Sequence, residues 1–584
     1  MNGQQINSVD KASSIGYLVT PSSSSEYLVL CDERQKDLSF SENSLVYVRY
    51  KARVSSGKVI EVETLGYTGE LRLENPYSQN PIDRVALAHH GDEIDGDGVD
   101  QKYLKVYPLA TINLENGQPL PIGLPPSRSR FYFVEETQLE NYYRSRETTY
   151  KFGYLSGTNV PIGLDVRHFG QGDKGWGDAR MIGVAGRTGS GKTVVVAGLV
   201  GAYAIHQELG ILIVDPQGQF GSLDRWGQYV GELGKNPQKW SWRMSAAFAQ
   251  AQRLGDVTVV KSSEINLGND TQTFLALLRK QKFWESLRGG IKSDKIELAE
   301  TQLLRFLDEK KQAKKPLTDL QWNENLFDLI VDIVTAGYRD QDEQKNLIYT
   351  RTGASDRAGE IWHAVLSYFD PGTRPYSMDN LVRKVLVGRK IVILDIDEPE
   401  DDMKQLFQWK LFSALKLQAQ RIYYDALSKG QQSNVNALIV VDEAQRIIPE
   451  FPEGELQKNT LSVVKDAINT GRKLGIGWIF ATQSVSNIDK GIWGQMGTKI
   501  VGYGFGTGAD RERLMEICGN DREVLNRYLR MPMPLQTGTY WFLVQGELVG
   551  LGNGNQSLFV DCFPTQADTL NYNRHLTQKI LFIP

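Results

Sequence analysis

Cysteine is scarce in this chain of 584 residues, which holds only Cys31, Cys518 and Cys562. Three widely separated thiols do not suit a disulfide framework, and no pair has the close spacing of a zinc site. The six histidines show no H-x₃–₅-H pattern either. This scarcity argues against a secreted disulfide scaffold and against a structural zinc domain, and it favours a reducing compartment.

Long hydrophobic runs are missing as well. The first residues, MNGQQINSVDK, lack the apolar stretch of a signal peptide, and the longest apolar run, residues 194–205, is too short to cross a bilayer. We therefore expect a cytoplasmic protein that has no membrane partner. The net charge of −4 shows no overall excess of basic residues, so any DNA contact has to come from a local basic surface.

One glycine-rich segment carries the first chemical signal. Gly186, Gly191, Lys192 and Thr193 fit the phosphate-loop pattern G-x-x-x-x-G-K-[ST]. Glycine lets the backbone turn tightly and aim consecutive N–H groups at a phosphate, the lysine can reach the β- and γ-phosphates, and the threonine hydroxyl can bind Mg²⁺. The predicted nucleotide-binding residues are Gly186, Thr188, Gly189, Ser190, Gly191, Lys192, Thr193 and Val194.

The context of this loop decides between a nucleotide site and a turn that binds nothing. An apolar run at 181–185 reads as a strand, 194–205 as a helix and 211–214 as the next strand, which ends at Asp215. The loop thus lies at the strand-to-helix corner of a βαβ unit, where a phosphate meets the positive end of the helix dipole. This context favours the nucleotide site.

A second signal is the segment ALIVVDEAQ at 437–445. Five apolar residues predict a buried strand, at the end of which Asp442 and Glu443 emerge. In phosphate-loop ATPases such a pair divides the work: Asp442 would hold Mg²⁺, and Glu443 would orient and deprotonate the attacking water. The alternative is an N-terminal helix cap followed by an acidic residue in the first turn, which the helix dipole favours anyway.

Two more polar residues follow. Arg472 lies in the last turn of a helix predicted over 460–474, where it could compensate the helix dipole or act as an arginine finger on a neighbour's γ-phosphate. Gln483 follows an apolar strand at 477–482 and could sense the γ-phosphate or cap a loop. The residues alone leave both alternatives open.

Apolar and polar residues alternate over 45–54, and further short strands are predicted nearby, so residues 1–150 are predicted to form a small β-barrel. The nucleotide-binding core is predicted to occupy 151–240 and 386–564. Between them, 241–385 is predicted to be a helical insertion, with no strand expected until residues 390–396. The tail 565–584 has no obvious place in its own domain, and we expect it to dock on a neighbouring subunit.

Taken together, these motifs resemble the HerA group within the HerA/FtsK class of hexameric P-loop motor ATPases. The resemblance rests on GRTGSGKT at 186–193, DPQGQF at 215–220, VVDEAQRIIPE at 440–450 and GRKLGIGWIFATQS at 471–484. Two positions depart from the family pattern: Gln219 stands where a glutamate is usual, and Gln445 where a histidine is usual.

The resemblance implies an α/β fold that has a RecA-like P-loop core, an N-terminal β-barrel similar to the HAS barrel, and a helical insertion. It also implies a homo-hexamer that hydrolyses ATP with Mg²⁺ between subunits, with Arg472 as the leading arginine finger and Arg180 as a second candidate. Double-stranded DNA would pass through the ring, and a separately encoded nuclease or NADase effector would dock on the barrel face, in DNA end processing or antiviral defence. The alternatives are an ATP-regulated scaffold that activates an effector enzyme and, less favoured because nothing here anchors to a membrane, a motor of the VirB4 kind.

Overall fold

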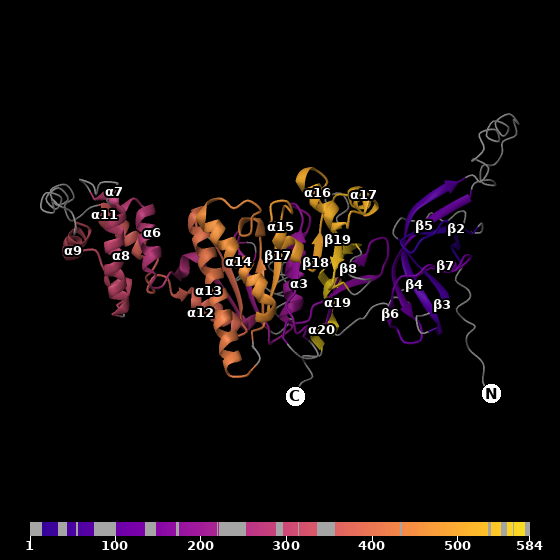
Figure 1. The fold of residues 1–584 in the computed structure, drawn as a ribbon, viewed down its shortest axis with the longest axis horizontal. Coiled ribbons are helices and arrows are strands. Elements are labelled where there is room, and N and C mark those ends of the chain that lie inside the picture. The colour runs from indigo at the N-terminus through magenta and orange to yellow at the C-terminus, as the bar shows by residue number, and fades with distance from the viewer. Residues whose placement is uncertain are drawn as a thin grey trace, which may run out of the picture.

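The structure is a computed structural model. It describes residues 14–32, 44–53, 57–74, 101–134, 148–170, 175–218, 220, 253–287, 296–313, 315–335, 357–396, 398–431, 435–534, 539–549, 557–564 and 566–578. Figure 1 shows a barrel at one end of the molecule, a large sheet covered by helices in the middle, and a group of helices at the other end. Gln219 and residues 579–584 lie outside the described residues.

The N-terminal part is a closed barrel of six antiparallel strands. They are β1 (Gly16–Val19), β2 (Tyr27–Cys31), β3 (Leu45–Arg53), β4 (Val59–Glu74), β5 (Gln101–Asn113) and β7 (Arg130–Phe133), and the pairing of β2 with β5 closes the ring. The short strand β6 (Pro119–Leu120) pairs only with β5. Apolar side chains from alternate positions fill the interior, and closure removes the sheet edges. The predicted barrel is confirmed.

The middle part is a mixed sheet of eleven strands in the order β12-β15-β11-β16-β17-β10-β18-β19-β20-β8-β9. The parallel strands are β10 (Met181–Ala185), β11 (Gly210–Asp215), β12 (Val257–Lys261), β15 (Ile391–Asp395), β16 (Ala437–Val441), β17 (Ile476–Thr482) and β18 (Thr498–Val501). Antiparallel strands extend the sheet beyond β18: β19 (Trp541–Gly546), β20 (Leu558–Cys562), β8 (Thr149–Leu155) and β9 (Pro161–Asp165). The order β11-β16-β17-β10-β18 is that of a RecA-like core, so the predicted fold class is confirmed.

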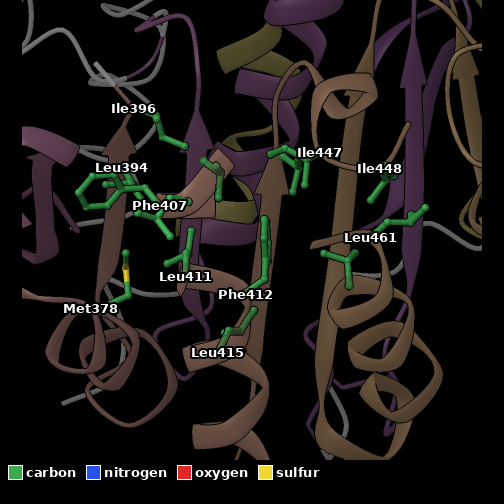
Figure 2. Close-up of a cluster of buried hydrophobic side chains, with 14 of the residues drawn as sticks. Met378, Leu394, Ile396, Phe407, Leu411, Phe412, Leu415, Ile447, Ile448 and Leu461 are labelled. Atoms are coloured by element: carbon green, nitrogen blue, oxygen red, sulfur yellow. The ribbon is translucent and has the colours of Figure 1, made fainter. Parts of the chain in front are cut away.

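Helices cover this sheet. Because they bury its parallel strands, these strands consist of continuous apolar runs. They are α3 (Lys192–Ala204), α12 (Met378–Leu386), α13 (Asp401–Ser428), α14 (Gly454–Leu474), α15 (Lys490–Gln495), α16 (Gly508–Ile517) and α17 (Arg522–Arg530). Figure 2 shows part of the core, where Phe407 and Leu411 of α13 meet Leu394 of β15. The turn η7 (Ala444–Arg446) lies between β16 and α14.

The far end of the molecule is helical. Its helices are α6 (Thr271–Lys280), α7 (Phe283–Ser286), α8 (Ile296–Gln312), α9 (Glu324–Thr335) and α11 (Arg357–Leu366), with the 3₁₀ turns η3 (Leu254–Asp256), η4 (Ser262–Glu264) and η6 (Leu317–Asp319). Aromatic rings form its centre: the rings of Phe274 and Trp362 lie 4.9 Å apart, edge to face.

The expectation that no strand precedes residues 390–396 is wrong. Strand β12 lies inside the predicted insertion 241–385 and pairs with β15 at the edge of the main sheet, and the short strands β13 (Ile265–Asn266) and β14 (Tyr376–Ser377) pair with each other. The five residues of β12 are too few to show a period, and their pairing partner lies more than a hundred residues away. Local sequence patterns do not contain such a contact.

The C-terminal tail also needs a correction, because residues 566–578 do have a place in their own domain. Helices α19 (Gln566–Tyr572) and α20 (Arg574–Gln578) lie beside β8. Asn573 accepts a hydrogen bond of 2.8 Å from the Lys151 amide and donates one of 2.6 Å to the Lys151 carbonyl. In the part of the chain that the structure describes, no helix is both long and apolar enough to cross a membrane.

Candidate nucleotide-binding and hydrolysis site

The predicted site residues come from three neighbouring parallel strands. The phosphate loop follows β10, Asp442 and Glu443 follow β16, and Gln483 follows β17. Because β10 pairs with β17 and β17 pairs with β16 in parallel, all three strand ends meet at one edge of the sheet. This edge is where ligands bind in open α/β sheets.

The backbone of the loop explains its glycines. Gly189 has φ of 84° and Gly191 has φ of 85°, both in the left-handed region that favours glycine. A Cβ at Gly191 would also come within 2.7 Å of the Tyr540 ring, and a Cβ at Gly186 within 2.2 Å of the Ser190 hydroxyl oxygen. The Gly186 amide donates to the Thr482 carbonyl over 3.1 Å, which fixes the loop against β17.

The remaining loop positions surround the start of α3. Gly191 is the N-terminal cap of this helix, and the Val194 amide donates to the Gly191 carbonyl over 3.0 Å. Thr193 therefore lies in the first turn, where helix N–H groups face a bound anion. Thr188 donates a hydrogen bond of 3.1 Å to the Gln483 side-chain oxygen, so the loop and the end of β17 are in direct contact.

Lys192 is the charged centre of the site. Its side chain is nearly buried, with 7% of the residue exposed, and its Nζ lies 3.1 Å from Oε1 of Glu443 and 3.7 Å from Oδ1 of Asp442. A buried ammonium is stable only beside opposite charges. The structure thus brings three of the predicted site residues, Lys192, Asp442 and Glu443, into contact.

Glu443 adopts a left-handed backbone with φ of 50°, which costs energy for a residue that has a side chain and is typical of functional positions. Its carboxylate accepts hydrogen bonds from Lys192, from Gln483 over 2.5 Å and from Gln445. Burial alone would raise the pKa of Glu443, but Lys192 and the two amides outweigh it and hold the pKa below its usual range. The carboxylate is therefore ionised at neutral pH.

Asp442 has a different environment. Only 1% of the residue is exposed, and neither carboxylate oxygen accepts a hydrogen bond from the described residues. The pKa of Asp442 is raised to about 6, mainly by burial. The ammonium of Lys192 lowers this pKa, whereas the nearby carboxylates of Asp215 and Glu443 raise it further. A buried carboxylate with free lone pairs, at the same edge of the sheet as the loop that carries Thr193, fits a hard cation such as Mg²⁺.

Mg²⁺ at such sites usually keeps several waters and takes only one or two protein ligands. The described residues contain no group of three or more His, Cys, Asp or Glu side chains arranged to hold a metal ion by themselves. The fit to Mg²⁺ therefore rests on Asp442 and Thr193 together with substrate oxygens.

The two arginine candidates lie at backbone positions away from the strand ends that carry the site. Arg472 lies in the last turn of α14, which Gly475 ends with φ of 69°, and its side chain lies outside the described residues. Arg180 precedes β10 and so lies at the opposite edge of the sheet from the loop. Its guanidinium pairs with Glu547 and lies 4.7 Å from the centre of the Trp176 ring.

Sequence reasoning missed three residues at this edge. Gln445, noted only as a departure from the family pattern, accepts from Thr482 over 2.8 Å and donates to Glu443, so it positions that carboxylate. Asp510 of α16 accepts hydrogen bonds from the loop after β17, and Tyr540 lies against Gly191. A motif shows none of these contacts, although the position of Gln445 two residues after Glu443 was a usable signal.

The RecA-like strand order and a glycine-rich loop beside a carboxylate pair define this chain as a P-loop ATPase, an ATP hydrolase. Residues 150–415 match the family model described as the central domain of the helicase HerA. The predicted resemblance to HerA-type P-loop ATPases is thereby confirmed. None of the curated proteins matches the chain.

Several solved structures are similar at low identity. VirB4 of Thermoanaerobacter pseudethanolicus is 10% identical over 71% of this chain and 96% of that chain, with a TM-score of 0.35. The bacterial conjugative coupling protein TrwB is 13% identical over 74% and 93%, with a TM-score of 0.37. The genome packaging NTPase B204 from Sulfolobus turreted icosahedral virus 2 is 10% identical over 64% and 97%, with a TM-score of 0.26.

Proposed function

We propose that this protein is a ring-forming, Mg-ATP-dependent translocase or helicase on double-stranded DNA. The observation that carries the proposal is the contact of Lys192 with both Asp442 and Glu443 at the strand edge of a HerA-type core. A lysine and two carboxylates beside a loop with left-handed glycines are the groups that P-loop ATPases use for phosphoryl transfer from ATP.

Each residue then has a role. The N–H groups of 186–194 cradle the phosphates, and Lys192 binds their outer oxygens. Glu443, ionised and fixed by Gln483 and Gln445, orients the attacking water and takes its proton. Gln483, which contacts both Glu443 and Thr188, senses the γ-phosphate.

Asp442 and Thr193 would hold Mg²⁺, which neutralises charge on the phosphates when it is bound. The two unsatisfied oxygens of Asp442 support this assignment. The chain's own contribution is to keep that carboxylate buried and correctly placed at the end of β16.

The proposal extends to the assembly. Six subunits form a ring with an ATP site at each interface, and Arg472 completes the neighbour's site. DNA passes through the centre, and a nuclease or NADase effector docks on the barrel face, in DNA end processing or antiviral defence in the cytoplasm. The proposed domains are the barrel at 1–150, the core at 151–240 and 386–564, the insertion at 241–385, and a tail at 565–584.

The test combines hydrolysis with movement on DNA. Lys192→Ala is expected to abolish ATP hydrolysis and the ATP-dependent displacement of a third strand from a DNA triplex, whereas Lys490→Ala, at an exposed lysine paired with Glu516, is expected to retain both. Unchanged hydrolysis by Lys192→Ala would remove the loop from the mechanism. A wild-type protein that hydrolyses ATP, is not stimulated by DNA and displaces no strand would contradict the motor and favour the scaffold.

A further inference from the structure

Tyr540 lies at the nucleotide edge of the sheet although no motif points to it. It directly precedes β19, which runs antiparallel to β18, so β19 begins where the parallel strands end. Its carbonyl accepts a hydrogen bond of 2.7 Å from the Cys562 amide, which ties this point of the chain to β20. The residue is 38% exposed.

The ring of Tyr540 packs directly on the phosphate loop. A Cβ added to Gly191 would lie 2.7 Å from two ring carbons and 3.1 Å from the Tyr540 Cβ. Gly191 is also the N-terminal cap of α3, directly before Lys192. The ring therefore occupies the space that a side chain at this cap position would fill, and the backbone of Tyr540 is held by β20.

The strand order gives a bound triphosphate a direction. Glu443 and Gln483, which are proposed to act at the γ-phosphate, lie on the β16–β17 side of the loop. Tyr540 lies on the opposite side, next to β18 and β19. Because the phosphates of a nucleotide form a line from γ to α, the ribose and base leave the loop on the Tyr540 side.

We propose that the Tyr540 ring stacks on the base of the nucleotide and gives the site a preference for purines. This inference rests on the proposed function, since it takes the loop at 186–193 as the phosphate site. A partly exposed aromatic ring on a fixed backbone can stack on a base through one face and needs no hydrogen bond to the base. Stacking becomes stronger as the base becomes larger. The Tyr540 side chain would thus select purine over pyrimidine triphosphates.

The test measures the affinity of the full chain for Mg-ATP, Mg-CTP and inorganic tripolyphosphate. Tyr540→Ala is expected to weaken ATP binding roughly ten-fold, to weaken CTP binding less, and to leave tripolyphosphate unchanged because it has no base. Tyr540→Phe keeps the ring and should bind all three as the wild type does. Tyr424→Ala, which removes a 62% exposed tyrosine on α13, is the matched control and should change nothing.

Two results would overturn the inference: unchanged ATP affinity in Tyr540→Ala, or an equal loss for tripolyphosphate, which would mean that the ring only shapes the loop. Lys192→Ala separates this failure from failure of the proposed site. If Lys192→Ala weakens all three ligands while Tyr540→Ala weakens none, only the stacking role is wrong. If Lys192→Ala weakens none of them, the phosphate site itself is wrong, and the stacking role with it.

Discussion

The Nζ of Lys192 lies 3.1 Å from Oε1 of Glu443, so the lysine that is proposed to bind phosphate also contacts the proposed base. The same contact lowers the pKa of Glu443 against the effect of burial. Phosphate binding and water activation are therefore coupled through one ammonium group. Removing the ammonium is therefore expected to raise the pKa of Glu443.

Glu443→Gln is expected to bind ATP but to lose hydrolysis by about 100-fold or more, because an amide cannot accept the proton of water. Single-turnover hydrolysis and retention of labelled ATP on gel filtration measure the two effects separately. Glu300→Gln is the control, since Glu300 also accepts hydrogen bonds from an arginine and a tryptophan but lies in the helical part. Rapid hydrolysis by Glu443→Gln would refute the assignment of the base.

Asp442 predicts a pH dependence of stability. Its folded-state pKa of about 6 lies above the ordinary value of 3.8, so the folded protein binds this proton more tightly than the unfolded chain does. The stabilisation is complete below the unfolded pKa and is lost as the pH rises through about 6. Asp442→Asn removes the titration and should remove this part of the pH profile.

The measurement is the Tm of wild type and Asp442→Asn, without nucleotide and in a chelator, at several pH values between 4.5 and 7.5. The difference, variant minus wild type, should become more negative toward pH 4.5 by about 2 °C or more, because only the wild type gains from protonation. Asp425→Asn, at an exposed position of α13, controls for the change in net charge. A difference that is flat across this range would contradict the raised pKa.

Asp510 is expected to position the residue that senses the γ-phosphate. Its Oδ1 accepts hydrogen bonds from the Ser484 hydroxyl over 3.0 Å and from the Ser486 amide over 2.9 Å, so it fixes the loop that follows Gln483. Asp510→Ala should lower kcat on the order of ten-fold with little change in KM for ATP. The reason is that a misplaced Gln483 disturbs the geometry of the reacting groups more than it disturbs the binding of ATP.

Asp521→Ala is the matched control, since Asp521 accepts from the Val524 amide in the same helical pair. It should cost some stability at the start of α17 and leave kcat unchanged. Equal effects of Asp510→Ala and Asp521→Ala on kcat would mean that Asp510 acts only through the stability of the helices.

Contiguous motifs explain which parts of the site could be predicted. The loop at 186–193 and the pair Asp442–Glu443 are each local in sequence, and the βαβ pattern brings them to one edge of a parallel sheet. The barrel was predictable because the alternation at 45–54 is long and regular. Each of these features is encoded by a few residues that follow one another in the sequence.

The missed parts depend on contacts between distant segments. Strand β12 shows no helix or strand period in its five residues and is defined by pairing with β15. Tyr540 reaches Gly191 because antiparallel strands extend the parallel sheet, and α19 packs beside β8, which belongs to that same extension. Sequence patterns describe periodicity within an element and do not specify which elements become neighbours.

Arg472 provides the sharpest test of the ring, because its proposed role requires a second subunit. Arg472→Ala and Glu443→Gln should each abolish hydrolysis when present alone. Mixed rings should recover activity, since an intact carboxylate in an Arg472→Ala subunit then faces an intact arginine from a Glu443→Gln subunit. For random assembly at equal amounts, about one quarter of the interfaces combine both intact groups.

The control is Lys473→Ala, at the next residue of the same last turn of α14. If Arg472 only compensates the helix dipole, both substitutions should cost a similar small amount of stability and neither should abolish hydrolysis. Mixing Arg180→Ala with Glu443→Gln tests the second candidate in the same way. Each variant carries a different affinity tag, and purification on both tags in turn establishes that the rings are mixed. If such rings recover no hydrolysis, Arg472 is not a finger that acts between subunits.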